Sequence, residues 1–180
     1  MEFKNNHVQA CILITEDDPG VMTLIKESLS ELPFRIIEAV NGKEAFACLS
    51  REKIDLMILD YNLPDLNGGL LISTLKTEGR FIPPFIIITG LGDERIAVQM
   101  MKQGARDYLV KDKEFLEMLP QTVKKVQHQL STENKLSKAE EEIKTKNRIL
   151  QTILDGIPDI INLQTPDHET LLQRQIAFGY

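Results

Sequence analysis

Short apolar runs alternate along the chain with longer segments in which apolar residues recur every three or four positions. The runs are predicted to be buried strands, at residues 10–15, 34–39, 56–60, 85–88 and 106–110. The intervening segments are typical of amphipathic helices, and a fifth helix follows residue 115. Strands that alternate with helices predict an α/β fold, in which a five-stranded parallel sheet has right-handed crossovers and helices on both faces.

Chemically reactive side chains stand at the carboxyl ends of the predicted strands. Glu16 and Asp17 follow the first strand, Asp60 ends the third, and Thr89 and Lys111 follow the fourth and fifth. The carboxyl ends of parallel strands share one edge of a sheet, so these five side chains are expected to converge. Taken alone, Asp60 could equally cap the turn that follows it.

The three carboxylates favour a cation at this edge. Packed together, they repel and raise one another's pKa values unless positive charge neutralises them. Mg²⁺ fits, because it prefers a few carboxylate oxygens and also binds phosphate oxygens. Asp60 can then act as a nucleophile toward phosphorus, while Lys111 and the Thr89 hydroxyl hold the charge of the transferred group.

Four segments in the right order, residues 12–19, 59–68, 88–90 and 104–111, resemble the receiver domain of two-component response regulators. The resemblance covers roughly residues 8–130 and implies a flavodoxin-like sheet of strand order 2-1-3-4-5. It also implies that Asp60 accepts a phosphoryl group from the phosphohistidine of a sensor histidine kinase or phosphotransfer protein.

The same resemblance assigns roles to the other residues of the site. Glu16, Asp17 and Asp60 would hold Mg²⁺ together with the backbone carbonyl of Asn62. Thr89 and Tyr108 would form a switch, in which the threonine moves toward the phosphate and the tyrosine turns inward behind it.

The sequence departs from the family pattern in two places. Asp112 stands where members usually have a proline after the lysine, and a cis bond without proline costs about 3–4 kcal/mol. We therefore predict a trans Lys111–Asp112 peptide and a locally different loop. Glu16 is longer than the usual aspartate but should still reach the ion, directly or through water. Asn62 and Leu91 are predicted to flank the path of the water that hydrolyses the phosphate.

The fifth helix extends well beyond the receiver-like region. Val123, Val126 and Leu130 have coiled-coil spacing, and a second register follows, out of phase by one residue: Leu136, Ala139, Ile143, Leu150, Ile153 and Ile157. We predict a parallel homodimer through residues 123–153. The alternative is a single solvated helix that packs back on its own domain.

The predicted organisation is an N-terminal tail (1–7), a receiver domain (8–120), an extended helix or coiled-coil linker (121–155) and a final segment (156–180). Residues 153–161 are similar to the entry of PAS sensor domains, so the last segment is a partial PAS-like region or a tail. Either the chain is the N-terminal part of a longer protein, such as a hybrid sensor histidine kinase, or its tail is a vestige that folds against the coil.

Composition narrows the functional classes. The net charge of −6 and the absence of a basic cluster with interleaved aromatics argue against nucleic-acid binding. No apolar run has membrane-spanning length, and Cys11 and Cys48 have no metal or disulfide spacing, so a cytoplasmic protein is expected.

Two other functions stay open at this point. One is a non-phosphorylated receiver-like scaffold that acts only by dimerisation. The other is a haloacid-dehalogenase-type phosphohydrolase, which needs a second aspartate where this chain has Asn62. No kinase box or nucleotide-binding motif is visible, so the predicted chemistry is that of an autocatalytic phosphoryl acceptor.

Overall fold

The computed structural model describes residues 9–90 and 94–156. It contains one parallel sheet in the order β2-β1-β3-β4-β5, as predicted. The strands are β1 (Ala10–Thr15), β2 (Phe34–Ala39), β3 (Leu56–Asp60), β4 (Phe85–Thr89) and β5 (Asp107–Val110). The helices are α1 (Pro19–Ser28), α2 (Gly42–Arg51), α3 (Gly68–Thr77), α4 (Glu94–Gln103) and α5 (Phe115–Gly156).

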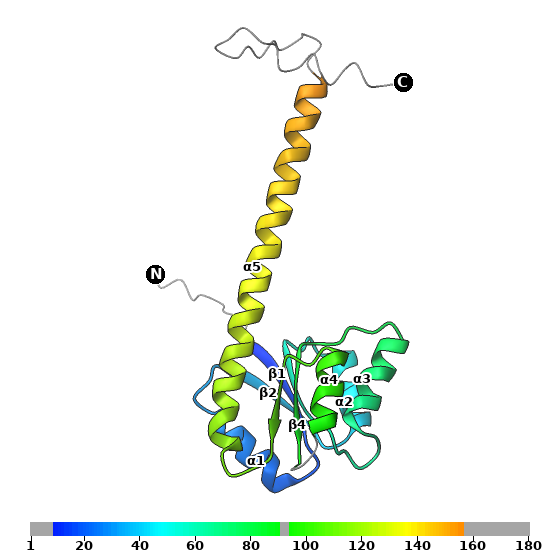
Figure 1. Cartoon of the computed structure of the whole chain (residues 1–180), viewed down its shortest axis with the longest axis vertical. Coiled ribbons are helices and arrows are strands. Elements are labelled where there is room, and N and C mark those ends of the chain that lie inside the picture. Colours follow the sequence, from blue (N-terminus) through cyan, green and yellow to red (C-terminus); the bar gives the residue numbers. More distant parts are fainter. Residues whose placement is uncertain (1–8, 91–93, 157–180) are drawn as a thin grey trace. The chain divides into compact units, whose positions relative to one another are not determined.

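Helices cover both faces of the sheet (Figure 1). Alternate residues of a strand point to opposite faces, so each strand contributes to two cores. Leu13 and Leu59 belong to the core beneath α2, α3 and α4. Ile14 and Ile58 belong to the core beneath α1 and the beginning of α5. The central strands are thus apolar on both sides, which explains their continuous apolar runs.

Polar side chains fix the starts of the helices that follow the strands. Asp18 caps α1 by accepting hydrogen bonds from the N–H groups of Gly20 and Val21, at 2.7 and 2.9 Å. Asn41 caps α2 and Asn67 caps α3 in the same way. These caps satisfy N–H groups that lack helical partners, and they set the course of the loops at the carboxyl edge of the sheet.

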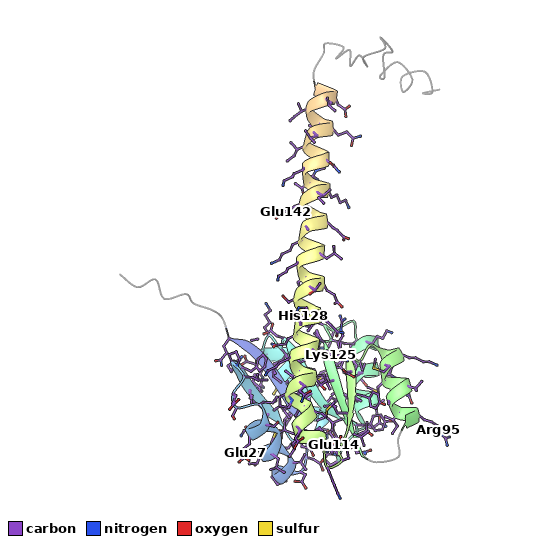
Figure 2. The ribbon with its side chains drawn as sticks, turned by 60° about the vertical axis from the view of Figure 1, so that its left-hand side comes forward. Glu27, Arg95, Glu114, Lys125, His128 and Glu142 are labelled. Atoms are coloured by element: carbon purple, nitrogen blue, oxygen red, sulfur yellow. The ribbon has the colours of Figure 1, made fainter. Side chains whose placement is uncertain are left out.

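The two parts of α5 have different environments. The contacts of the chain divide it into two units, residues 1–130 and 131–180. Phe115, Leu119, Val123 and Val126 are at most 5% exposed and belong to the core on the α1 face. This corrects the predicted dimer interface, since Val123 and Val126 are already buried within one chain. From residue 131 to residue 155 every side chain is exposed (Figure 2).

Several predictions concern residues beyond those described. The N-terminal tail, Leu91 and residues 157–180 of the PAS-like segment all lie outside the described ranges. Among residues 9–90 and 94–156, no helix combines the length and hydropathy needed to cross a membrane.

Candidate functional site

The ends of three strands bring an ammonium group and two carboxylates together. Glu16 directly follows β1, Asp60 ends β3 and Lys111 directly follows β5. The Lys111 Nζ lies 2.6 Å from the Asp60 Oδ2 and 2.7 Å from the Glu16 Oε2. Lys111 therefore bridges two carboxylates that are 44 residues apart in the chain, at the edge of the sheet where the predicted topology brings them together.

A third carboxylate completes the cluster. Glu16, Asp17 and Asp60 each offer an oxygen atom, and these three atoms lie within 4.8 Å of one another. Glu16 is fully buried and Asp60 is 3% exposed, whereas Asp17 is exposed. The cluster is thus buried on one side and open to solvent at Asp17.

Burial and the charge of the ion-pair partner shift the pKa values of Glu16 and Lys111 in opposite directions. Burial, with the nearby Asp60 charge, raises the pKa of Glu16 even though Lys111 opposes the change. Burial also acts to lower the pKa of Lys111, but the hydrogen bonds and charges of Asp60 and Glu16 outweigh it and raise that pKa. Lys111 consequently carries its positive charge at neutral pH.

The loop after β3 closes tightly around the Asp60 backbone. The Asp60 Oδ1 accepts a hydrogen bond from the Asn62 N–H at 3.0 Å, and the Gly68 N–H donates to the Tyr61 carbonyl at 2.8 Å. A Cβ atom at Gly68 would lie only 3.1 Å from the Asp60 carbonyl oxygen. Glycine at position 68 avoids this tight contact where α3 begins close to the acidic cluster.

The two predicted switch residues differ in environment. Thr89 is 1% exposed at the end of β4, and its hydroxyl donates to the Gly90 carbonyl at 2.8 Å. Tyr108, on β5, is 42% exposed and lines an open hollow of about 560 Å³ together with Ala97, Val98, Met101 and Lys102. Thr89 thus shares the sheet edge with the acidic cluster, while Tyr108 faces α4.

The loop from β5 to α5 has the predicted trans peptide. No peptide bond among the described residues is cis, so the Lys111–Asp112 bond is trans. The Asp112 N–H donates to the Val110 carbonyl at 2.8 Å, and the Asp112 carboxylate accepts from the Glu114 N–H at 3.0 Å. Proline could make neither bond, so Asp112 organises this turn in a way of its own.

A family comparison agrees with this arrangement. The model of the response regulator receiver domain matches residues 12–124, more than half of the chain. The chain belongs to the receiver domain family. Its receiver domain includes all the acidic residues of the cluster, together with Lys111.

Curated relatives share this receiver region. The transcriptional regulatory protein CrdR of Helicobacter pylori is 36% identical over 104 residues, which cover 58% of this chain and 49% of the relative. The probable transcriptional regulatory protein SilR of Salmonella typhimurium is 37% identical over 108 residues, which cover 60% and 47%. The chain thus spans about half the length of these relatives.

Solved receiver structures have the same fold. The receiver domain of a putative LuxO repressor protein from Vibrio parahaemolyticus superposes with a TM-score of 0.65 at 26% identity, covering 72% of this chain and 98% of that one. A two-component response regulator from Clostridium difficile superposes with a TM-score of 0.61 at 27% identity, covering 68% and 98%.

One residue near the site was missed by the sequence analysis. The Asp65 carboxylate, in the loop after β3, accepts hydrogen bonds from the N–H groups of Gly42 and Lys43 at 2.8 and 3.0 Å. These groups belong to the first turn of α2, more than 20 residues earlier in the chain. The sequence offers two signals for this contact, the Asn-Gly pair at the start of α2 and the acidic residue in the loop after β3. Neither signal shows that the two segments contact each other.

Proposed function

We propose that this receiver domain is a phosphoacceptor, with Asp60 as the residue that is modified. The observation that supports it is the position of Lys111, which pairs with both Asp60 and Glu16 at 2.6–2.7 Å beside the exposed Asp17. A carboxylate oxygen of Asp60 attacks the phosphorus atom of a phosphohistidine. The new O–P bond replaces the N–P bond, and the imidazole leaves as a neutral ring after it takes up a proton.

The donor set fits a hard divalent cation. Glu16, Asp17 and Asp60, with the backbone carbonyl of Asn62, would hold Mg²⁺, since its preferred ligands are oxygens. When bound, Mg²⁺ would offset the negative charge of the phosphoryl group during transfer. Lys111 stays protonated and contributes the remaining positive charge from the buried side of the site.

Thr89 and Tyr108 are the proposed switch. The Thr89 hydroxyl, now bonded to the Gly90 carbonyl, would turn to a phosphoryl oxygen and leave space behind it. The exposed Tyr108 ring would then move inward from the hollow beside α4. Such a switch is a two-state element that new charge-assisted hydrogen bonds bias toward one state.

The proposed partner is a sensor histidine kinase or a phosphotransfer protein, the usual phosphoryl donors of this family. A cytoplasmic site of action is part of this proposal, because both cysteines are free thiols. We also propose that a PAS-like region follows the helix, because residues 153–161 are similar to the entry of PAS domains.

The proposed output is a parallel homodimer formed by the second part of α5. Four apolar side chains there, each more than half exposed, recur at heptad spacing: Leu136, Ile143, Leu150 and Ile153. We call them the distal stripe. In this register Lys135 and Glu140 occupy flanking positions that attract each other across a parallel pair of helices. Dimerisation would remove the distal stripe from water.

Two alternative functions have less support from the site than phosphoryl acceptance. A silent scaffold would have no need for an ammonium group held between two buried carboxylates. A haloacid-dehalogenase-type hydrolase would need an acid two residues after its nucleophile, and Asn62 occupies that position.

The test is intact mass spectrometry after incubation with acetyl phosphate and Mg²⁺, with light scattering on the same samples. We expect one added phosphoryl group in the wild type and in Asp107→Asn, a control outside the cluster, and none in Asp60→Asn. A change in oligomer mass upon phosphorylation would connect the site to the helix. A folded wild type without an adduct would favour the scaffold instead.

A further inference from the structure

The loop between β3 and α3 is closed at its base, next to the acidic cluster. Asn62 and Asn67 face each other in an antiparallel bridge, and the Gly68 N–H donates to the Tyr61 carbonyl. The Asn62 N–H also donates to Asp60. A movement of the loop would therefore also change the positions of the Asp60 carboxylate and of the Asn62 carbonyl group.

The tip of the same loop lies against the first turn of α2. Both oxygens of Asp65 accept hydrogen bonds there, one from the Gly42 N–H and one from the Lys43 N–H. Burial acts to raise the pKa of Asp65, but these backbone N–H groups outweigh it and lower the pKa. Leu66 fills the space above Gly42, where a Cβ atom would lie 2.6 Å from the Leu66 Cγ. Charge and packing thus hold the tip at two adjacent points.

We infer that Asp65 and Leu66 are positioning residues, which hold the β3–α3 loop on α2 and thereby set the affinity of the acidic cluster for a divalent cation. Neither residue needs to touch the ion. The inference rests on the Mg²⁺ site of the proposed function. Groups that hydrogen-bond metal ligands directly commonly change metal affinity by about ten- to a hundredfold, and the effect of Asp65 is expected at the lower end of that range because it acts through the loop.

The first experiment measures Mg²⁺ binding to the full chain by calorimetric titration with MgCl₂ alone. Asp65→Ala should weaken binding by about tenfold, because the loop loses its anchor. The matched control is Asn41→Ala, which removes a hydrogen bond from the same end of α2, to the Glu44 N–H. It should change the dissociation constant less than twofold.

A second measurement needs no variant. Coupling between two sites is reciprocal, so Mg²⁺ should slow hydrogen exchange at the Gly42 and Lys43 amides in the wild type. Unchanged exchange at these amides, despite Mg²⁺ binding, would overturn the inference even if Asp65→Ala does not fold.

The two proposals fail in different ways. A wild type that binds no Mg²⁺ would refute the metal site of the proposed function and the positioning role with it. A wild type that binds Mg²⁺ while Asp65→Ala binds equally well would refute only the positioning role. Equal weakening in Asp65→Ala and Asn41→Ala would also refute it, since the cause would then be the stability of the α2 end.

Discussion

The two parts of α5 carry similar apolar spacing but have opposite environments. In residues 115–130 the stripe that contains Phe115 and Leu119 lies in the core of the receiver domain, with Val123 and Val126 fully buried. In residues 131–155 every side chain is exposed, although the four apolar residues of the distal stripe recur there at heptad spacing. Figure 2 marks the first part by Lys125 and His128 and the second by Glu142.

The difference shows that heptad spacing alone does not identify a partner. A helix that packs on a sheet and a helix that packs on a second helix both bury a stripe of residues three and four apart. The first part of α5 has its partner within the chain. In the second part, each of the four side chains of the distal stripe is more than half exposed, which is the reason for proposing a second copy.

The largest effect is expected from an acidic residue in the first part. Val123→Asp places an unpaired carboxylate in the receiver core and should lower the free energy of unfolding by about 4 kcal/mol. Urea denaturation followed by circular dichroism measures this. The adjacent exposed change Lys124→Asp should stay within about 0.5 kcal/mol of the wild type. Equal urea midpoints for the two variants would contradict the conclusion that the first part of α5 is buried in the receiver core.

The same kind of change in the second part should leave folding intact and weaken assembly. Ile143→Asp puts a charge in the middle of the distal stripe, so the dimer dissociation constant should rise at least tenfold, or about 1.4 kcal/mol. Sedimentation velocity over a range of concentrations measures it. Thr145→Asp, off the stripe, is the control and should assemble normally. A wild type that is monomeric at every concentration would contradict the proposed dimer.

A tighter dimer is expected when the polar residue that interrupts the distal stripe is replaced by an apolar one. Lys146 falls at a core position of the heptad between Ile143 and Leu150, and Lys146→Leu should tighten the dimer by about 1 kcal/mol. Lys144→Leu adds the same apolar group outside the core positions and should have little effect. If both changes tighten the dimer alike, nonspecific association rather than the predicted register is responsible.

The smallest effect is expected for a surface ion pair in the first part. Lys125 lies 2.8 Å from Asp107, but its side chain is 60% exposed. Lys125→Ala should therefore cost less than about 1 kcal/mol in unfolding free energy, and added salt should reduce the difference. A loss above about 2 kcal/mol would mean that charge, rather than apolar burial, attaches this part of α5 to the receiver.

Much of the fold follows from local pattern. The apolar runs identify all five strands, and the spacing of apolar residues between them indicates the helices. The order of the strands then brings Glu16, Asp60 and Lys111 to one edge without further information. These parts are predictable because each depends on residues that are close in sequence or on a general rule of parallel sheets.

Other features depend on long-range packing and were not predictable. The pattern placed Val123 and Val126 in a dimer, because it cannot distinguish a sheet from a second helix as the partner of a stripe. The contact of Asp65 with α2 crosses more than 20 residues. The direction of the Thr89 hydroxyl depends on a single rotamer, for which the sequence carries no signal.

The bridge formed by Lys111 has a consequence for charge balance. Three ionised carboxylates and one ammonium give the cluster a formal charge of −2, since −3 and +1 sum to −2. A divalent cation would bring it to neutrality, whereas a monovalent cation would leave one charge uncompensated. Lys111 thus offsets one of the three carboxylate charges, and without it a divalent cation would leave one of them uncompensated.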